Sequence, residues 1–286
     1  MTDLHTDLQT EPHTLHEQVQ FDVRHALAED IGSGDLTALL IDAKQQAHGR
    51  IIAREPAILC GQPWFNEAFA QVEPSVQITW HVAEGERIEP NQVLVEMSGS
   101  ARALVTAERT ALNFLQLLSG TATTVNTYVQ AIAGTGTHVV DSRKTIPGLR
   151  IAQKYAVRIG GGVNHRVGLY DGILIKENHI ATAGGVTPAL AHARAIVSAP
   201  DVAARAVAPF IQIEVETLEQ LQEALSAGAQ MILLDNMNHA QITQAVKINT
   251  EQFARQAFLE VSGNVSLENI RGYAELGVDR MSIVGL

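Results

Sequence analysis

The chain has 286 residues, a formal net charge of −11 and 46% hydrophobic residues. This length suits two domains, or one barrel with an appendage. The acidic balance excludes a broad nucleic-acid or anionic-membrane surface, because such partners require a large positive field. The sequence also has no apolar run near the roughly 18 residues that span a bilayer. The single cysteine, Cys60, fits a reducing compartment, so we expect a cytoplasmic protein without a membrane partner.

The first hundred residues predict a compact α+β layer. Residues 1–20 are polar and weakly periodic, which predicts a frayed lead-in. A short helix is expected from Phe21, and residues 29–37 form a turn-rich loop by their Gly, Ser and Asp content. Residues 48–97 combine alternating strand patterns with one helical stretch. This part carries no evident chemistry, and we expect it to serve packing or subunit contact.

A long helix is expected to begin at Thr106, which is a suitable N-cap. The pair Ser119-Gly120 predicts an interruption of this helix. Arg109 lies on its polar face, and its spacing alone makes it an ordinary surface arginine.

The segment 141–180 is a basic island in an acidic protein. It carries a local charge of +4, so the remainder of the chain carries −15. Such an island predicts an anionic ligand, and the alternative is a solvated basic surface. Its basic residues are Arg143, Lys144, Arg150, Lys154, Arg158, Arg166 and Lys176.

Two short apolar runs, 138–140 and 172–175, read as buried strands within this region. The basic residues Arg143, Lys144 and Lys176 come where those strands should end, and ligands bind at the carboxyl ends of parallel strands. The triplet Gly160-Gly161-Gly162 between them could bring backbone N–H groups close to a phosphate or carboxylate. The alternative interpretation is an ordinary glycine loop.

After residue 137, short apolar strands alternate with helical stretches at the spacing of βα units, which predicts an α/β barrel or a doubly wound sheet. The expected strands are 138–142, 172–177, 210–216, 231–235, 258–262 and 280–284, and the expected helices include 188–198, 217–227, 239–252 and 266–276.

Acidic residues stand at several of these strand ends. Glu214 and Asp235 would face the cationic mouth, where carboxylates can bind ribose hydroxyls or a divalent metal carried by a phosphate ligand. Glu216 stands at the same strand end as Glu214, and it could instead form a salt bridge with the basic island. The turn Ser262-Gly263-Asn264 is a candidate phosphate cradle. The histidines are scattered without HExxH or CxxC spacing, so no zinc site is predicted.

Several stretches together resemble the quinolinate phosphoribosyltransferase family, within the type II phosphoribosyltransferases. They are EDIGSGDLT (29–37), ERTALNFLQLLSG (108–120), the whole segment 141–180, IEVETLEQL (213–221), ILLDNM (232–237), LEVSGNVSLENI (259–270) and GVDRMSIVGL (277–286). The resemblance implies an N-terminal α/β sandwich domain over 21–120 and a C-terminal open, TIM-like α/β barrel over 121–286. It also implies a homodimer with shared active sites, with a hexamer as the larger alternative.

The reaction implied by the resemblance belongs to de novo NAD biosynthesis. Phosphoribosyl pyrophosphate (PRPP) and quinolinate would give nicotinate mononucleotide, pyrophosphate and CO2, with Mg2+ required. By the same resemblance, Arg109 from the partner subunit would bind the two carboxylates of quinolinate together with Arg143, His165 and Arg166. Lys144 and Lys176 would contact phosphates or substrate, Glu214 and Asp235 the ribose and metal, and Ser262, Gly263 and Asn264 the phosphate.

Two departures from the family pattern lie at the end of the chain. The family strand usually reads SVGAL and continues into a short segment that packs on the N-terminal domain. Here residues 282–286 read SIVGL, so Val284 stands where glycine approaches phosphate, and the sequence ends there. Two other functions stay open on the residues alone. One is a related phosphoribosyltransferase for nicotinate or another base, and the other is a non-catalytic barrel that binds a phosphorylated metabolite.

Overall fold

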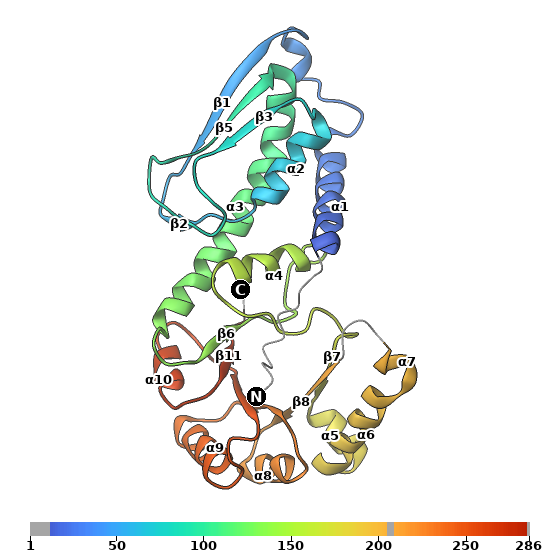
Figure 1. Cartoon of the computed structure of the whole chain (residues 1–286), viewed down its shortest axis with the longest axis vertical. Coiled ribbons are helices and arrows are strands. Elements are labelled where there is room, and N and C mark those ends of the chain that lie inside the picture. The colour runs from blue at the N-terminus through green and yellow to red at the C-terminus, as the bar shows by residue number, and fades with distance from the viewer. Residues whose placement is uncertain (1–11, 205–208, 285–286) are drawn as a thin grey trace. The chain divides into compact units, whose positions relative to one another are not determined.

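The computed structural model describes residues 12–204 and 209–284. These residues form two compact units (Figure 1). Residues 12–127 and 145–162 make up what we call the N-terminal unit, and residues 128–144 and 163–284 make up the barrel unit. Much of the basic island, including its glycine triplet, therefore belongs to the N-terminal unit.

The N-terminal unit is a small antiparallel sheet packed against helices. Its three-stranded sheet has the order β1-β5-β3, and β2 pairs with β4 in a second ribbon. The core is aromatic, with Trp64, Phe65 and Phe69 all fully buried. The strands are β1 (Gln46–Ile52), β2 (Ala57–Ile58), β3 (Gln77–Trp80), β4 (Arg87–Ile88) and β5 (Val93–Ser100), and the helices are α1 (Pro12–Ile31), η1 (Ala38–Leu40), α2 (Gln62–Val72), α3 (Ala101–Ala131) and α4 (Arg150–Ile159).

Helix α1 begins at Pro12, so the expectation that helix starts only near Phe21 is wrong. The physical reason is a buried stripe, because Val19 and Val23 both pack into the core of the N-terminal unit. Asp22 on the same helix accepts a hydrogen bond from Trp64 Nε1 at 2.9 Å. These buried contacts stabilise helical structure N-terminal to Phe21, although the sequence there is mostly polar. Residues 1–11 of the expected lead-in lie outside the described residues.

Helix α3 is continuous, which corrects both its expected start at Thr106 and its expected break at Ser119-Gly120. Its small polar residues bond to a neighbouring segment instead of ending the helix. Ser119 Oγ accepts from the Cys60 N–H at 2.9 Å, and Thr123 Oγ1 accepts from the Ile58 N–H at 2.8 Å. The side chains that suggested a break therefore connect α3 to the strand β2 region.

The glycine triplet allows close helix packing, and its backbone amides do not form an anion-binding site. The N–H groups of Gly160, Gly161 and Gly162 all donate to carbonyls in the last turn of α4, at 2.9 Å each. A Cβ on Gly160 would lie 2.5 Å from the carbonyl oxygen of Ala122 on α3. These glycines end α4 and let it approach α3 closely, so their amides are not available for a ligand.

The barrel unit contains a six-stranded parallel sheet of order β6-β11-β10-β9-β8-β7. Within the described residues β6 and β7 do not pair with each other, so the barrel is open between them. This confirms the predicted open α/β barrel, and helices cover the outside of the sheet in Figure 1. The strands are β6 (His138–Val140), β7 (Gly172–Ile175), β8 (Phe210–Val215), β9 (Met231–Asp235), β10 (Phe258–Ser262) and β11 (Arg280–Ser282), and the helices are α5 (Glu177–Ala183), α6 (Val186–Ser198), α7 (Pro200–Ala203), α8 (Leu218–Ser226), α9 (His239–Glu251) and α10 (Ile270–Ala274).

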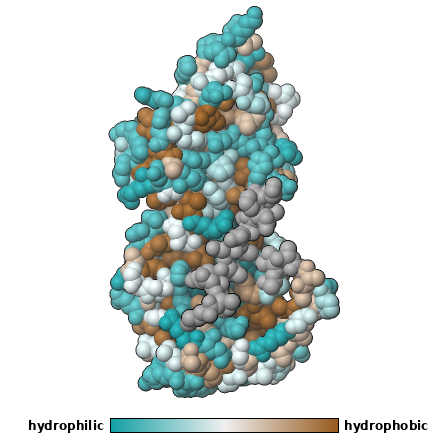
Figure 2. Space-filling view, viewed as in Figure 1, coloured by the Kyte–Doolittle hydropathy of each residue, from teal (hydrophilic) through white to brown (hydrophobic). Residues whose placement is uncertain are grey.

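The described surface is mixed in character. On the face shown in Figure 2, hydrophobic areas are interspersed with hydrophilic ones. Among the helices in the described part of the chain, none is long and apolar enough to cross a membrane.

Candidate active site

The carboxyl ends of the barrel strands gather most of the predicted site residues. Lys144 follows β6, Lys176 follows β7, and Glu214 stands near the end of β8. Asp235 ends β9, and residues 262–264 end β10. Because parallel strands present their carboxyl ends at one edge of the sheet, these groups share the mouth of the barrel unit.

Lys176 and Glu214 form an ion pair across this mouth. Lys176 Nζ lies 3.3 Å from Glu214 Oε2, and the Glu214 side chain is only 9% exposed. Burial raises the pKa of the Glu214 carboxyl, the charge of Lys176 opposes that rise, and the negative charge of Asp235 adds to it. The two carboxylates are therefore close enough to influence each other beside a single lysine.

The tips of β9 and β10 approach each other closely. Asn236 has a left-handed φ of 52°, and its Nδ2 donates to Asp235 Oδ2 at 2.8 Å. Gly263 has a φ of +87°, and a Cβ there would meet Asn236 Oδ1 at 2.7 Å. Only glycine fits this turn, on both conformational and steric grounds. Asn236 follows Asp235 directly at the end of β9, but it is not among the site residues that the sequence predicts.

Two arginines of the barrel unit lie near each other. Burial is the main reason that the pKa of Arg166 is lowered, and the positive charge of Arg143 lowers it further. Arg166 Nη1 donates to the Gly172 carbonyl at 2.9 Å, which anchors the guanidinium beside the start of β7. Two like charges held together in a partly buried place favour an anion that carries two negative charges.

Buried carboxylates fold the loop that carries Arg166. Asp141 accepts from Asn164 Nδ2 and from the His165 N–H, both at 2.7 Å. Asp171 accepts from two further backbone N–H groups, of Val167 at 2.7 Å and of Gly168 at 2.9 Å. Both aspartates are buried, and an ionised carboxylate that accepts several N–H groups holds a loop firmly.

His165 is buried, and both of its ring nitrogens have protein partners. Nδ1 accepts from the Arg166 N–H at 2.8 Å, and Nε2 lies 2.6 Å from Gln212 Oε1. The ring also packs edge-on against Phe210, with 5.3 Å between ring centroids. Gln212 was missed in the sequence; its signal is a polar residue two positions before Glu214 in an otherwise apolar strand.

Arg109 is the one predicted site residue outside the barrel unit. It lies on an exposed face of α3 in the N-terminal unit. The other ten predicted residues all lie in the barrel unit.

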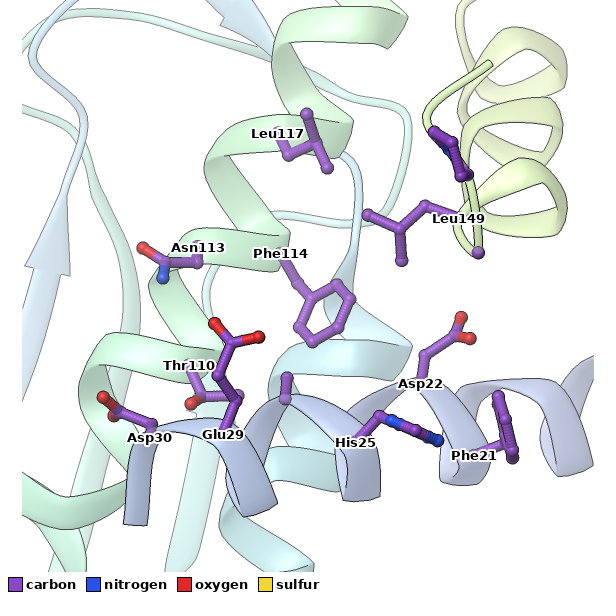
Figure 3. Close-up of a pocket in the computed structure, with 13 residues that line it drawn as sticks. Phe21, Asp22, His25, Glu29, Asp30, Thr110, Asn113, Phe114, Leu117 and Leu149 are labelled. Atoms are coloured by element: carbon purple, nitrogen blue, oxygen red, sulfur yellow. The ribbon is translucent and has the colours of Figure 1, made fainter. Parts of the chain in front are cut away.

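A cavity of about 610 Å³ lies in the N-terminal unit, bordered by α1, α3 and residues 147–149 (Figure 3). Its lining includes the carboxylates of Asp22, Glu29 and Asp30, together with aromatic side chains. The described residues that line it include no lysine or arginine. This cavity is therefore unsuited to a dicarboxylate or a pyrophosphate, and the cationic barrel mouth is the better candidate site.

The donor set at the mouth fits a magnesium ion brought by a phosphate ligand. In the described part of the chain no three His, Cys, Asp or Glu side chains are grouped to hold a metal. Mg2+ typically binds through one or two carboxylates plus substrate phosphates and waters. Glu214, and Asp235 whose negative charge acts on it, match that smaller set.

Comparison with known proteins gives the same family over both units. Sequence models of the N-terminal and C-terminal domains of quinolinate phosphoribosyl transferase match residues 35–119 and 121–286. The nicotinate-nucleotide pyrophosphorylase [carboxylating] of Mycobacterium leprae is 40% identical over 270 residues, which cover 92% of this chain and 91% of that protein. The quinolinate phosphoribosyltransferase [decarboxylating] 2b, mitochondrial, of Nicotiana tabacum is 34% identical over 276 residues, covering 90% of this chain and 75% of the relative.

Solved structures agree with the sequence matches. The nicotinate-nucleotide pyrophosphorylase structure from Francisella tularensis superposes with a TM-score of 0.85 at 42% identity, and the match covers 94% of this chain and 91% of that one. The resemblance inferred from the sequence motifs is confirmed. This chain belongs to the quinolinate phosphoribosyltransferase family.

Proposed function

We propose that this protein transfers the phosphoribosyl group of PRPP to quinolinate and that the product loses CO2 to give nicotinate mononucleotide. The observation that carries the proposal is that the neighbouring pair Arg143 and Arg166 and the Lys176–Glu214 ion pair belong to the same barrel unit. Membership of the family supports the same reaction. A carboxylating enzyme must hold two carboxylates, whereas an enzyme for nicotinate must hold one.

The arginines act on the dicarboxylate. A guanidinium binds a carboxylate through two parallel hydrogen bonds and stays charged when partly buried. Arg143 and Arg166 hold the two carboxylates of quinolinate and fix the plane of the pyridine ring. This places the ring nitrogen for attack on the ribose, and such positioning supplies a large part of the rate enhancement.

The remaining groups act on PRPP. The pyridine nitrogen forms a bond to ribose C1 while the bond from C1 to the pyrophosphate oxygen breaks, and pyrophosphate leaves with that electron pair. Lys144 and Lys176 stabilise the negative charge on the leaving group, and the turn 262–264 holds the phosphate of the ribose. Glu214 and Asp235 stabilise the positive charge that builds at C1.

Decarboxylation follows from the charge of the ring. Once ribosylated, the pyridine nitrogen is cationic, so the carboxylate at the adjacent carbon leaves as CO2 and its electron pair stays beside the positive nitrogen. A proton from water then occupies that carbon. Glu214 and Asp235 would hold Mg2+, which supplies further neutralisation of the pyrophosphate charge when bound.

The test is an assay that follows both products. Purified protein is incubated with quinolinate, PRPP and Mg2+, and nicotinate mononucleotide and CO2 are measured together, with nicotinate as the competing substrate. Equal amounts of both products, with nicotinate inert, are expected. Turnover of nicotinate without CO2 release would favour the related activity, and omission of Mg2+ should reduce turnover strongly.

The proposal includes a homodimer in which Arg109 of one subunit completes the other subunit's site. Support comes from its exposure on α3 and from its match to the family motif ERTALNFLQLLSG. Arg109→Ala and Lys176→Ala should each be inactive alone, and mixed dimers of the two should recover activity, because one site then has both residues intact. If mixing restores nothing although mixed dimers form, the shared site is refuted.

We also place the protein in the cytoplasm. A chain with a single, buried cysteine has no internal disulfide, which fits a reducing compartment. Cell fractionation with a membrane-protein control would test this location.

A further inference from the structure

A row of hydrogen-bonded, buried polar side chains lies inside the barrel unit, two residues before the strand ends that form the mouth. Gln212 stands two residues before Glu214 on β8, and Glu260 stands two residues before Ser262 on β10. Gln212 is 0% exposed and Glu260 is 1% exposed. Gln212 Nε2 donates to Glu260 Oε2 at 2.9 Å. Polar groups buried this deeply are costly unless each is satisfied, so the arrangement needs an explanation.

Glu260 fixes the direction of the hydrogen bonds. Burial alone would raise the pKa of its carboxyl, but the charge of Arg280 and the hydrogen bonds from Ser282 and Gln212 outweigh it, and the pKa is lowered. Arg280 Nε lies 2.9 Å from Glu260 Oε2, and Ser282 Oγ donates to Glu260 Oε1. An ionised carboxylate only accepts, so the neighbouring amide must present its nitrogen to Glu260.

The remaining links follow from that orientation. With its nitrogen on Glu260, Gln212 turns its oxygen toward His165 Nε2 at 2.6 Å. The amide oxygen accepts, so His165 carries its proton on Nε2. Nδ1 then keeps a lone pair, which accepts the Arg166 N–H at 2.8 Å. Every hydrogen bond in the chain from Glu260 to Arg166 thus has one direction.

We propose that Gln212 and Glu260 are positioning residues, which hold the His165 ring so that it fixes the backbone of Arg166 for dicarboxylate binding. This inference rests on the proposed function of Arg166. The guanidinium is anchored separately at the Gly172 carbonyl, so the two anchors together define where Arg166 presents its donors. Without Gln212, the ring of His165 loses the partner that sets its tautomer and rotation.

The experiment compares Gln212→Leu with a matched control. Asn249 is also a buried amide of the barrel unit, with 2% exposure, and it exchanges two hydrogen bonds with Ala257 just before β10 begins. Asn249→Leu therefore removes comparable buried bonds at the opposite end of the strand. Phthalate is the probe, because it is a planar dicarboxylate whose C–H in place of the ring nitrogen prevents turnover.

For Gln212→Leu we expect phthalate affinity, measured by calorimetry, to fall at least about tenfold and the quinolinate KM to rise similarly. The KM for PRPP should stay within about twofold of wild type. Asn249→Leu should lower the melting temperature without changing phthalate affinity. If Gln212→Leu does not fold, Gln212→Asn keeps a polar group that is too short to reach both partners, and phthalate affinity should still fall about fivefold.

Two results would overturn the positioning role. One is a folded Gln212 variant with wild-type phthalate affinity, and the other is an equal loss of phthalate binding in the Asn249→Leu control. A wild-type protein that neither binds phthalate nor consumes quinolinate would instead refute the proposed function. The two failures are thus distinguished by the wild-type measurements alone.

Discussion

Replacing Gly160 with alanine tests whether the glycine triplet packs α4 against α3 or serves a phosphate. The new Cβ would lie 2.5 Å from the Ala122 carbonyl oxygen and 2.8 Å from Val125 Cβ. Real Cβ atoms essentially never come within 3.0 Å of a heavy atom outside their own and adjacent residues, and the nearest neighbour is helix backbone, which cannot rotate away. Either α4 moves or α3 bends.

The expected loss follows from that overlap. Overpacking one methyl group into a tight contact costs about 1–3 kcal/mol, and the rigid neighbour here favours the upper end. For a unit of this size, a loss of about 3 kcal/mol lowers the melting temperature by roughly 6–12 °C. Gly120→Ala is the matched control, because the methyl group added at this exposed glycine of α3 would meet no neighbouring atom within 4 Å. That change should raise stability by up to about 1 kcal/mol.

Thermal unfolding followed by circular dichroism measures both variants. Steady-state kinetics well below the transition should give wild-type KM values for PRPP and quinolinate, since the triplet amides bond within α4. A Gly160→Ala protein with unchanged melting temperature and a raised KM for PRPP would refute the packing role and would support phosphate binding by the triplet amides.

Two further predictions concern the barrel mouth. Burial raises the folded-state pKa of Glu214, so its contribution to stability is complete below its ordinary value of 4.5 and is lost as pH rises through the raised value. Glu214→Gln should therefore become more stable relative to wild type as pH rises through that window. Urea unfolding of the ligand-free proteins measures this, and a free energy of unfolding that changes with pH equally in both proteins would contradict it. Arg166→Lys should raise the quinolinate KM at least about tenfold, because a lysine cannot bind a carboxylate with two parallel bonds. An equal rise in the KM for PRPP would instead indicate general damage to the site.

The strands of the barrel unit could be predicted from the sequence because each one is a short apolar run that is recognisable by itself. The runs that became β9 and β10, 231–235 and 258–262, were predicted with their observed bounds. Strand ends also located Lys176, Glu214 and Asp235, since the position of a residue after a buried run is a local property. These features required no knowledge of distant contacts.

Features that depend on distant partners could not be predicted. Gly160 looks like a loop glycine until Ala122, far away in the sequence, is placed against it. Glu84 reads as part of a turn, yet its carboxylate accepts the N–H groups of Gly61 and Gln62 at the start of α2. The same limit hid Gln212, whose partners come from two other segments of the barrel unit.

The buried acids of the basic island shape the loop that carries Arg166, and the arginines beside them decide what the site can bind. Asp141 and Asp171 accept hydrogen bonds from the loop that carries Arg166, so their charges are used to shape that loop. The positive charge of Arg143 repels that of Arg166 and, after the larger effect of burial, lowers the pKa of Arg166, while the negative charge of Asp171 opposes this shift. A dianion relieves that repulsion at both guanidinium groups, whereas a monocarboxylate relieves it at one. Discrimination between quinolinate and nicotinate should therefore come from this pair, and it should weaken when salt screens the two charges.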